Sequence, residues 1–241
     1  MERSADSFNL VRSVWTKEDG VDFERYLETL TREDKIEWTR KIANTDKPLL
    51  AIPAPETERI AKSISKGDFL SFLDLNLTKY FEEVCINGWL IMKIKDFDLR
   101  FRYLEKYFDS VDSWATCDNL KFSTKKDLDK QWAKALVYVR DDRSFVRRIG
   151  VRIAFSYVEN DEYLPAVYDL IASLVDEKEY YVNMCVAWLV CELFVKRRDD
   201  TFAFLQKDKL NAFTVNRAVQ KCRDSFRVTK EDKDELLRFK K

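Results

Sequence analysis

Glycine and proline are scarce in this chain. Its 241 residues include four glycines and four prolines, about 3% together, whereas an average chain carries roughly 12%. Strands require frequent tight turns, and tight turns favour Gly, Pro and Asn. The composition therefore predicts long helices joined by short polar loops.

The chain also contains no histidine. This excludes catalytic systems that pair Ser or Cys with His, and zinc or haem sites that use His ligands. The four glycines, at positions 20, 67, 88 and 150, cannot build a Gly-rich phosphate loop. These absences argue against a nucleotide-dependent enzyme, and we expect neither a cofactor nor a metal.

The cysteines and the apolar segments indicate where such a protein resides. The first twenty residues lack the apolar run and cleavage site of a signal peptide, and the longest apolar stretches, such as residues 184–191, are too short to span a membrane. The cysteines are odd in number, form no CxxC pair and are typical of reduced core residues. We therefore expect a soluble, cytoplasmic protein. The five are Cys85, Cys117, Cys185, Cys191 and Cys222.

Apolar residues recur at spacings of three and four along most of the chain, which indicates amphipathic helices. Residues 23–30 begin one such pattern, and Ile36, Trp38 and Ile42 continue in a second. The segment 46–56 holds three of the four prolines. It predicts an extended loop, because proline disfavours the helical conformation at the residue before it.

After this loop the pattern predicts pairs of helices of similar size. Asp68, which follows a break at Lys66-Gly67, is well placed as an N-cap, and Thr229 marks the start of the last helix. Two-helix units of roughly 35 residues predict an all-α fold, an α-solenoid of HEAT-like two-helix repeats, with an irregular helical bundle as the alternative. We expect a single domain over residues 1–241, with residues 1–20 as a less ordered lead-in. The pairs are expected over residues 56–75, 78–93 with 96–108, 126–140 with 143–158, 162–174 with 178–197, and 211–224 with 229–239.

Charge is balanced overall but unevenly distributed. The chain has 43 Lys and Arg against 43 Asp and Glu, yet residues 196–241 alone carry 14 basic and 8 acidic side chains. A second basic cluster lies within residues 140–152. Such stretches on one part of a solenoid would suit a phosphate backbone, and a solvated helix face is the plainer interpretation.

One short segment, residues 113–118 (SWATCD), combines an indole with a carboxylate. Trp114 and Asp118 stand four apart, so on a helix they share one face. Each also fits a structural role, because large aromatic residues dominate protein cores and Asp118 could cap the next helix or pair with a lysine.

Two further segments place unusual residues in helices. Arg148 and Arg152 share a face in the first, although either would also serve as an ordinary ion-pair partner. In the second, residues 180–188, aromatic and apolar side chains surround the polar Asn183, and the run ends in Trp188.

Together these segments resemble the AlkD-like DNA alkylation repair family. The strings SWATCD, FVRR and YYVNMCVAWLVCELF occur here in the order found in that family. RIAKSISKGDFLSFL and KYFEEVCINGWLIMKIK resemble its early repeats, and FTVNRAVQKCRDSFRV resembles its closing helices. The resemblance covers about residues 20–230. It implies a HEAT-like solenoid whose concave, basic face holds duplex DNA.

The resemblance also implies roles for individual residues. The family's tryptophan-xxx-aspartate motif matches Trp114 and Asp118, its catalytic-face arginine matches Arg148, and its second cleft tryptophan matches Trp188. The second motif position, often acidic in the family, is Ala115 here.

A competing register exists for the motif. Phe108 and Asp112 have the same spacing with Phe in place of Trp, so Asp112 stays open as the alternative catalytic carboxylate. Arg148, Arg152 and Asn183 are the expected DNA contacts.

Chemistry agrees with what the resemblance implies. A purine alkylated at N3 or N7 is already cationic, so it leaves without a strong general acid, and bond breaking moves positive charge onto the sugar. Asp118 would stabilise that charge and orient water, while Trp114 and Trp188 would hold the electron-poor nucleoside and Arg148 would bind a phosphate.

We therefore expect a monofunctional DNA-alkylpurine N-glycosylase. Its substrates would be cationic lesions such as 3-methyladenine and 7-methylguanine in double-stranded DNA, and the protein would act as a monomer. The alternative is a non-catalytic HEAT-like module that binds DNA or protein.

Overall fold

The computed structural model of the chain describes residues 8–123 and 125–241. These residues form fourteen α-helices and four short 3-10 helices, and the described part of the chain contains no β-strand. The all-α fold class is confirmed, and the succession of paired helices is that of a helical-repeat solenoid. The chain divides into two compact units, Met1–Lys121 and Phe122–Lys241.

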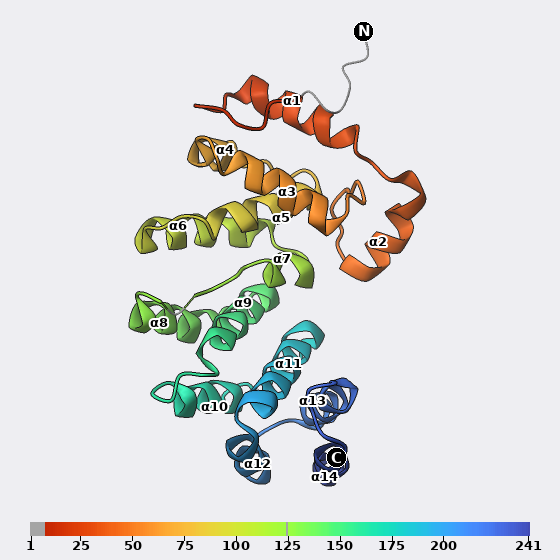
Figure 1. Cartoon of the computed structure of the whole chain (residues 1–241), viewed down its shortest axis with the longest axis vertical. Helices are drawn as coiled ribbons and strands as arrows, with labels where there is room; N and C mark the ends of the chain where they lie inside the picture. The colour runs from red at the N-terminus through yellow and green to blue at the C-terminus, as the bar shows by residue number, and fades with distance from the viewer. Residues whose placement is uncertain (1–7, 124) are drawn as a thin grey trace. The chain divides into compact units, whose positions relative to one another are not determined.

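In the view of Figure 1, helices α3 to α7 of the first unit are stacked below α1, and α2 stands to one side. Helix α5 is central to this unit, because α3, α4, α6 and α7 all pack against it. Nearly all of its residues are buried, the polar Glu82, Glu83 and Asn87 among them, as expected for a helix that has neighbours all round. The helices are α1 (Lys17–Glu28), α2 (Ile36–Ala43), α3 (Ala54–Ile64), α4 (Phe69–Asp74), α5 (Phe81–Ile91), α6 (Phe97–Tyr107) and α7 (Trp114–Asp118).

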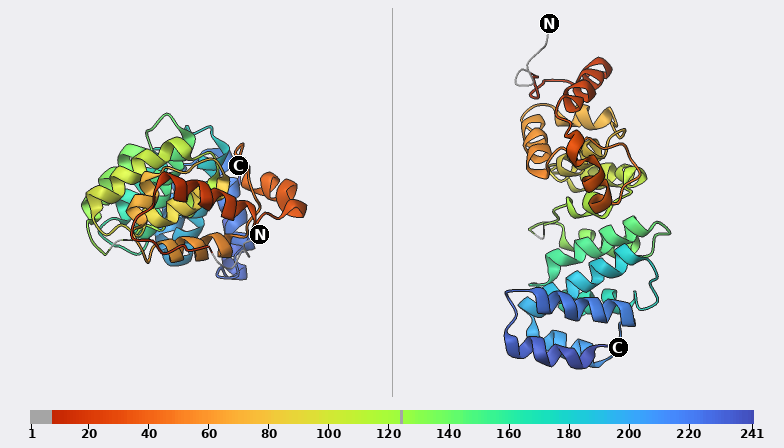
Figure 2. Two further views of the ribbon diagram at one scale, coloured as in Figure 1. Left: turned by 90° about the horizontal axis from the view of Figure 1, so that it is seen from above. Right: turned by 90° about the vertical axis from the view of Figure 1, so that its right-hand side faces the viewer.

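The second unit is built in the same way around its longest helix, α11. Helices α9, α12 and α13 pack against α11, and α8 packs against α9. Figures 1 and 2 show α11 and α13 side by side. The helices are α8 (Leu128–Tyr138), α9 (Ser144–Ala154), α10 (Leu164–Ala172), α11 (Tyr180–Lys196), α12 (Arg198–Gln206), α13 (Ala212–Asp224) and α14 (Lys230–Glu235).

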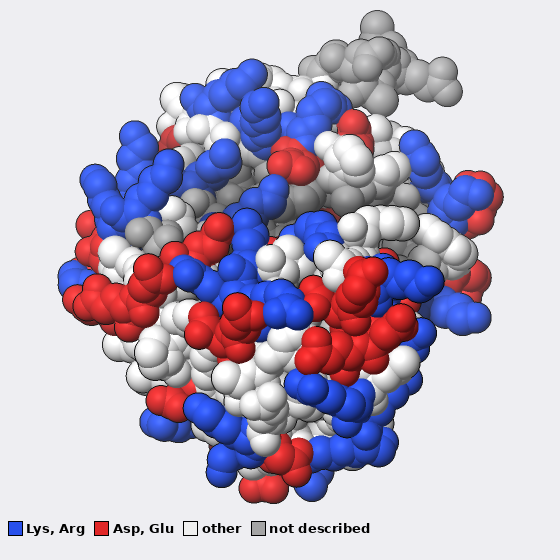
Figure 3. Space-filling model, turned by 60° about the horizontal axis from the view of Figure 1, so that its bottom comes forward, with Lys and Arg blue, Asp and Glu red and all other residues white. Residues whose placement is uncertain are grey.

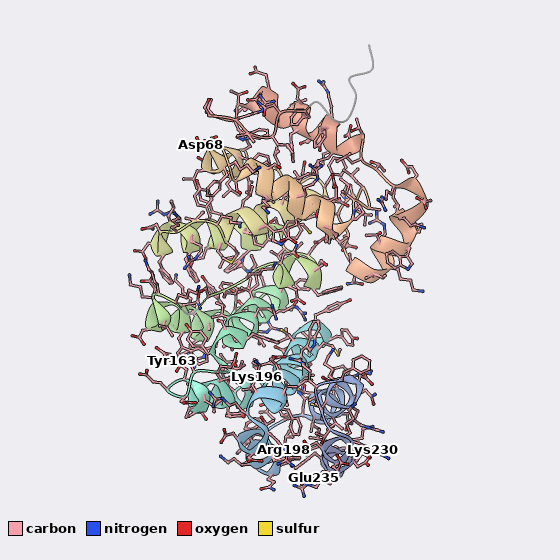
Figure 4. The ribbon with its side chains drawn as sticks, viewed as in Figure 1. Asp68, Tyr163, Lys196, Arg198, Lys230 and Glu235 are labelled. Atoms are coloured by element: carbon pink, nitrogen blue, oxygen red, sulfur yellow. The ribbon has the colours of Figure 1, made fainter. Side chains whose placement is uncertain are left out.

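Both N-caps expected from the sequence are confirmed. The side chain of Asp68, labelled in Figure 4, accepts a hydrogen bond from the Ser71 backbone N–H at the start of α4. Thr229 accepts one from the Asp232 N–H at the start of α14. The break before Asp68 also has a packing reason, since a Cβ on Gly67 would lie 2.3 Å from the backbone oxygen of Arg12.

Three local features differ from the sequence expectation. The extended loop ends earlier than residue 56, because α3 begins at Ala54 and takes Pro55 into its first turn, where a missing N–H costs nothing. Helix α12 was not expected. It follows α11 after the single non-helical residue Arg197, with no Gly or Pro to mark the change. Trp38 belongs to the apolar pattern of α2 but is 65% exposed.

The chain before α1 is partly integrated into the first unit. Residues 1–7 of the expected lead-in lie outside the described residues. Trp15 is buried, and its ring centroid lies 5.0 Å from that of Phe72 and 5.9 Å from that of Phe23. Thr16 then begins α1 with a capping box to Asp19.

Candidate functional site

Helix α7 is anchored to the end of α2 by two consecutive residues. Ser113 is buried, and its hydroxyl donates a hydrogen bond to the Ala43 oxygen and accepts one from the Ala115 N–H. The indole N–H of Trp114 donates to the Ile42 oxygen at 2.9 Å. These bonds fix α7 relative to α2 and hold the Trp114 ring in one orientation.

A cavity of about 410 Å³ lies beside Trp114 in the first unit. Its size falls in the usual range for small-molecule pockets. Trp38, Trp89 and Trp114 contribute to its walls, and Arg32 and Lys35 supply positive charge. Three indoles around one cavity form a surface on which a flat, electron-poor ring can stack.

Glu82 lines the same cavity with a buried carboxylate. Its oxygens accept hydrogen bonds from the backbone N–H groups of Leu50 and Ile52. Burial raises the pKa of Glu82. The hydrogen bonds to Leu50 and Ile52 hold the loop before α3 in place, so Glu82 has a structural role.

Asp118 is the last residue of α7 and is half-buried. It lies one helical turn after Trp114, so the two side chains share a face of α7. The structure thus places the tryptophan and carboxylate of the first candidate motif together on one short helix.

The competing motif residues have different surroundings. Phe108 is buried, and Asp112 accepts hydrogen bonds from the Thr45 hydroxyl at 2.6 Å and the Asp46 N–H at 3.1 Å. Asp112 therefore ties the loop after α2 to the segment before α7.

In the second unit, Trp188 is exposed and Arg148 is not. The Trp188 side chain on α11 is 44% exposed, and the Lys221 ammonium lies 4.5 Å from the centroid of its ring. Arg148 is only 2% exposed, and its guanidinium donates to the backbone oxygen of Tyr181. Arg148 therefore links α9 to the start of α11 from inside the unit.

The two other expected DNA contacts also interact within the second unit. Asn183 is buried; its amide donates to the Glu177 oxygen and accepts from Asn211 and Thr214. Arg152 is half-buried, with its guanidinium carbon 4.4 Å from the centroid of the Phe155 ring. Asn183 thus joins α11 to α13, and three of its four hydrogen-bonding positions are occupied.

The basic stretches take part in many ion pairs within the second unit. Arg147 forms a bidentate ion pair with Glu177. Arg198 contacts Asp232 at 2.6 Å and Glu235 at 3.6 Å, which joins α12 to α14 (Figure 4). Where the C-terminal helices come forward, positive and negative side chains are intermixed (Figure 3). The local excess of positive charge is therefore partly neutralised by neighbours. Further pairs are Arg143–Asp141, Lys196–Glu159, Arg197–Asp161, Arg227–Glu192, Arg238–Glu235 and Lys241–Asp208.

The candidate residues accordingly form two groups, one in each unit. Trp114 and Asp118 belong to the first unit, and Trp188 with its neighbour Lys221 belongs to the second. Sequence reasoning missed Trp38, Trp89 and Lys221 as members of these surroundings. No local signal in the sequence connects them, because each is brought to its neighbour by the packing of separate helices.

One comparison with known proteins identifies a family. The family model described as DNA alkylation repair enzyme matches residues 23–222, most of the chain. A search of curated proteins found no match.

No helix in the described ranges is both long and apolar enough to cross a membrane. Within the same ranges, no group of three or more His, Cys, Asp or Glu side chains is arranged to hold a metal ion.

Proposed function

Because the chain belongs to the DNA alkylation repair enzyme family, we propose that it is a monofunctional N-glycosylase acting on duplex DNA. It releases cationic alkylated purines such as 3-methyladenine and 7-methylguanine by hydrolysis of the N-glycosidic bond. The observation that carries this proposal is α7, which holds Trp114 and Asp118 on one face. Of these two residues, Trp114 lines the tryptophan-walled cavity.

The proposed reaction does not require a strong general acid to protonate the departing purine. An alkylated, cationic purine is already a good leaving group, and positive charge develops on the sugar as the bond breaks. The Asp118 carboxylate stabilises that charge and orients the attacking water. Trp114, on the same helix as Asp118, offers its ring face to the cationic nucleoside.

Replacing Asp118 by Asn tests the catalytic assignment. We expect release of 7-methylguanine from methylated duplex DNA to slow by at least about 100-fold, because a pre-placed charge-stabilising group is removed, while DNA binding persists. Asp112→Asn is the matched control, and we expect that variant to lose stability and retain release. Release at the wild-type rate by Asp118→Asn would contradict the assignment, and loss of release in Asp112→Asn alone would transfer the role to that residue.

The alternative is a non-catalytic module that uses the same scaffold to bind DNA or protein. It is favoured by the burial of Arg148 and Asn183, whose polar atoms bond within the second unit. DNA binding without base release by the wild-type protein would select a DNA-binding module. A protein-binding scaffold would lack the steep loss of DNA affinity with salt that phosphate neutralisation produces.

A further inference from the structure

A second cavity of about 410 Å³ lies in the first unit, where the end of α4, the end of α6 and the loop between α4 and α5 meet. Its size falls in the usual range for small-molecule pockets. Its lining residues are all different from those of the cavity beside Trp114. It is therefore separate from the candidate site described above.

Asn87 of α5 brings a buried acceptor to this second cavity. It lines the cavity and is only 5% exposed. Its amide nitrogen donates to the Leu77 oxygen at 2.7 Å, which fixes the orientation of the amide. The Oδ1 atom is buried and has no hydrogen-bond partner among the described residues. Because an unpaired buried acceptor is unfavourable, a ligand that donates to Oδ1 gains affinity.

Lys47, in the loop after α2, brings donors to the same cavity. Its ammonium donates to the Thr78 oxygen at 3.3 Å, which uses one of the three N–H bonds that an ammonium carries. Lys47 and Asn87 thus bind the backbone oxygens of two consecutive residues, Thr78 and Leu77. A donor group and an acceptor group therefore lie near each other in this wall of the cavity.

The ends of α4 and α6 supply further polar groups. The Tyr103 hydroxyl donates to Asp74 at 2.6 Å. Burial and the Asp74 carboxylate raise the pKa of Tyr103 to about 12, so its hydroxyl stays protonated at neutral pH. The Lys106 ammonium lies 5.7 Å from the centroid of the Tyr103 ring. Asp74 and Lys106 are exposed, which places them at the mouth of the cavity.

The charges in the lining balance. Two lysines, Lys47 and Lys106, are matched by two aspartates, Asp74 and Asp109. A phosphate ester would be attracted by the lysines and repelled by the aspartates. The lining therefore favours a ligand that has no net charge and offers both donors and acceptors.

We propose that this second cavity binds a small neutral polyol of monosaccharide size. A hydroxyl both donates and accepts, so neighbouring hydroxyls of one sugar can donate to Asn87 Oδ1 and accept from the Lys47 ammonium. The apolar side chains of Leu73 and Ile91, which also line the cavity, contact the carbon–hydrogen side of the ring.

A zwitterion such as a free amino acid is the competing ligand. It would place a full ammonium charge beside Asn87, whose neutral amide oxygen needs only a hydroxyl. Moving that charge out of water is costly, and a neutral hydroxyl avoids the cost. The inference goes beyond the proposed function and does not depend on it, because the two cavities have different lining residues.

Saturation-transfer difference NMR titrations of the full chain with D-ribose, D-glucose and myo-inositol test the inference. We expect at least one of these polyols to bind the wild type. Asn87→Ala and Lys47→Met should each weaken that binding by at least about 5-fold, because each variant removes a hydrogen-bond partner of the ligand. Circular dichroism confirms that each variant is folded, and Lys47→Met keeps the inference testable if Asn87→Ala does not fold.

Lys95→Met is the matched control, because Lys95 is an exposed lysine between α5 and α6 that does not line the cavity. The inference is overturned if none of the three polyols binds the wild type, if either folded cavity variant binds as tightly as the wild type, or if Lys95→Met weakens binding equally. Serine and ribose 5-phosphate are the charged comparisons. Tighter binding of either one than of the neutral polyols would assign the cavity to a zwitterion or an anion and would overturn the inference.

Discussion

Trp114 and Asn183 show how partners far away in the chain decide what a side chain can do. The Trp114 indole N–H is bound to a carbonyl 72 residues away, which leaves the ring faces as its remaining means of contact. Asn183 directs its amide oxygen toward Asn211 and Thr214. Asn183 was expected to contact DNA, but it is buried and links α11 to α13 instead.

Glu83 offers a test of buried charge in the first unit. It is fully buried and accepts a hydrogen bond from the Tyr80 N–H, while its Oε1 atom has no hydrogen-bond partner among the described residues. Burial raises the pKa of Glu83 from 4.5 to about 7. The folded protein therefore holds this proton more tightly than the unfolded chain, so the contribution of Glu83 to stability decreases as the pH rises from 4.5 to 7.

Replacing Glu83 by Gln should remove this pH dependence. Glutamine retains the capping bond to Tyr80 and carries no charge. We expect Glu83→Gln to be more stable than the wild type at pH 8, by an amount on the order of 3 kcal/mol, and to match it near pH 4. Urea unfolding measured across this range checks the prediction, and two curves that stay parallel would contradict it.

At the scale of helices, the close approach of α8 and α9 depends on Gly150. A Cβ there would lie 2.7 Å from both Val139 N and Val139 Cγ1, and 3.0 Å from the Ala135 oxygen. Two of these atoms belong to the backbone, so the clash cannot be relieved by a rotamer change. Gly150 thus sets the distance between the two helices.

We expect Gly150→Ala to destabilise the protein by about 1–3 kcal/mol, the usual cost of overpacking, although alanine favours helix more than glycine does. Gly20→Ala is the control, because the nearest atom to its Cβ would be the flexible end of Leu75 at 3.2 Å. Thermal unfolding compares the variants. A Gly150→Ala protein as stable as Gly20→Ala would show that α8 and α9 can move apart freely.

The helices also show which parts of the fold could be predicted from the sequence. Asp68 and Thr229 act on backbone groups three residues away, so their capping roles are visible in the local sequence. Helix α12 escaped prediction because only Arg197 separates it from α11. For the site, the spacing of Trp114 and Asp118 could be recognised, whereas the cavity walls at Trp38 and Trp89 depend on tertiary packing that periodicity does not encode.

At the scale of the whole molecule, zero net charge has consequences for DNA binding. With 43 basic and 43 acidic side chains, the chain has no net charge to attract a polyanion over long distances. The DNA affinity that the proposed function requires would therefore have to come from local basic groups rather than from the net charge. Screening by salt then acts on a few contacts rather than on the molecule as a whole.

The absence of histidine makes this charge nearly constant around neutral pH. Histidine is the side chain whose ordinary pKa falls between pH 6 and 8, and the chain has none. We expect DNA affinity at fixed salt to change by less than about 2-fold over this range, because the phosphates and the Lys and Arg side chains keep their charges. Fluorescence anisotropy titrations at pH 6, 7 and 8 provide the measurement. A loss of affinity of about 10-fold between pH 6 and 8 would contradict the prediction and would require a titrating carboxyl or thiol at the DNA interface, since no imidazole can supply it.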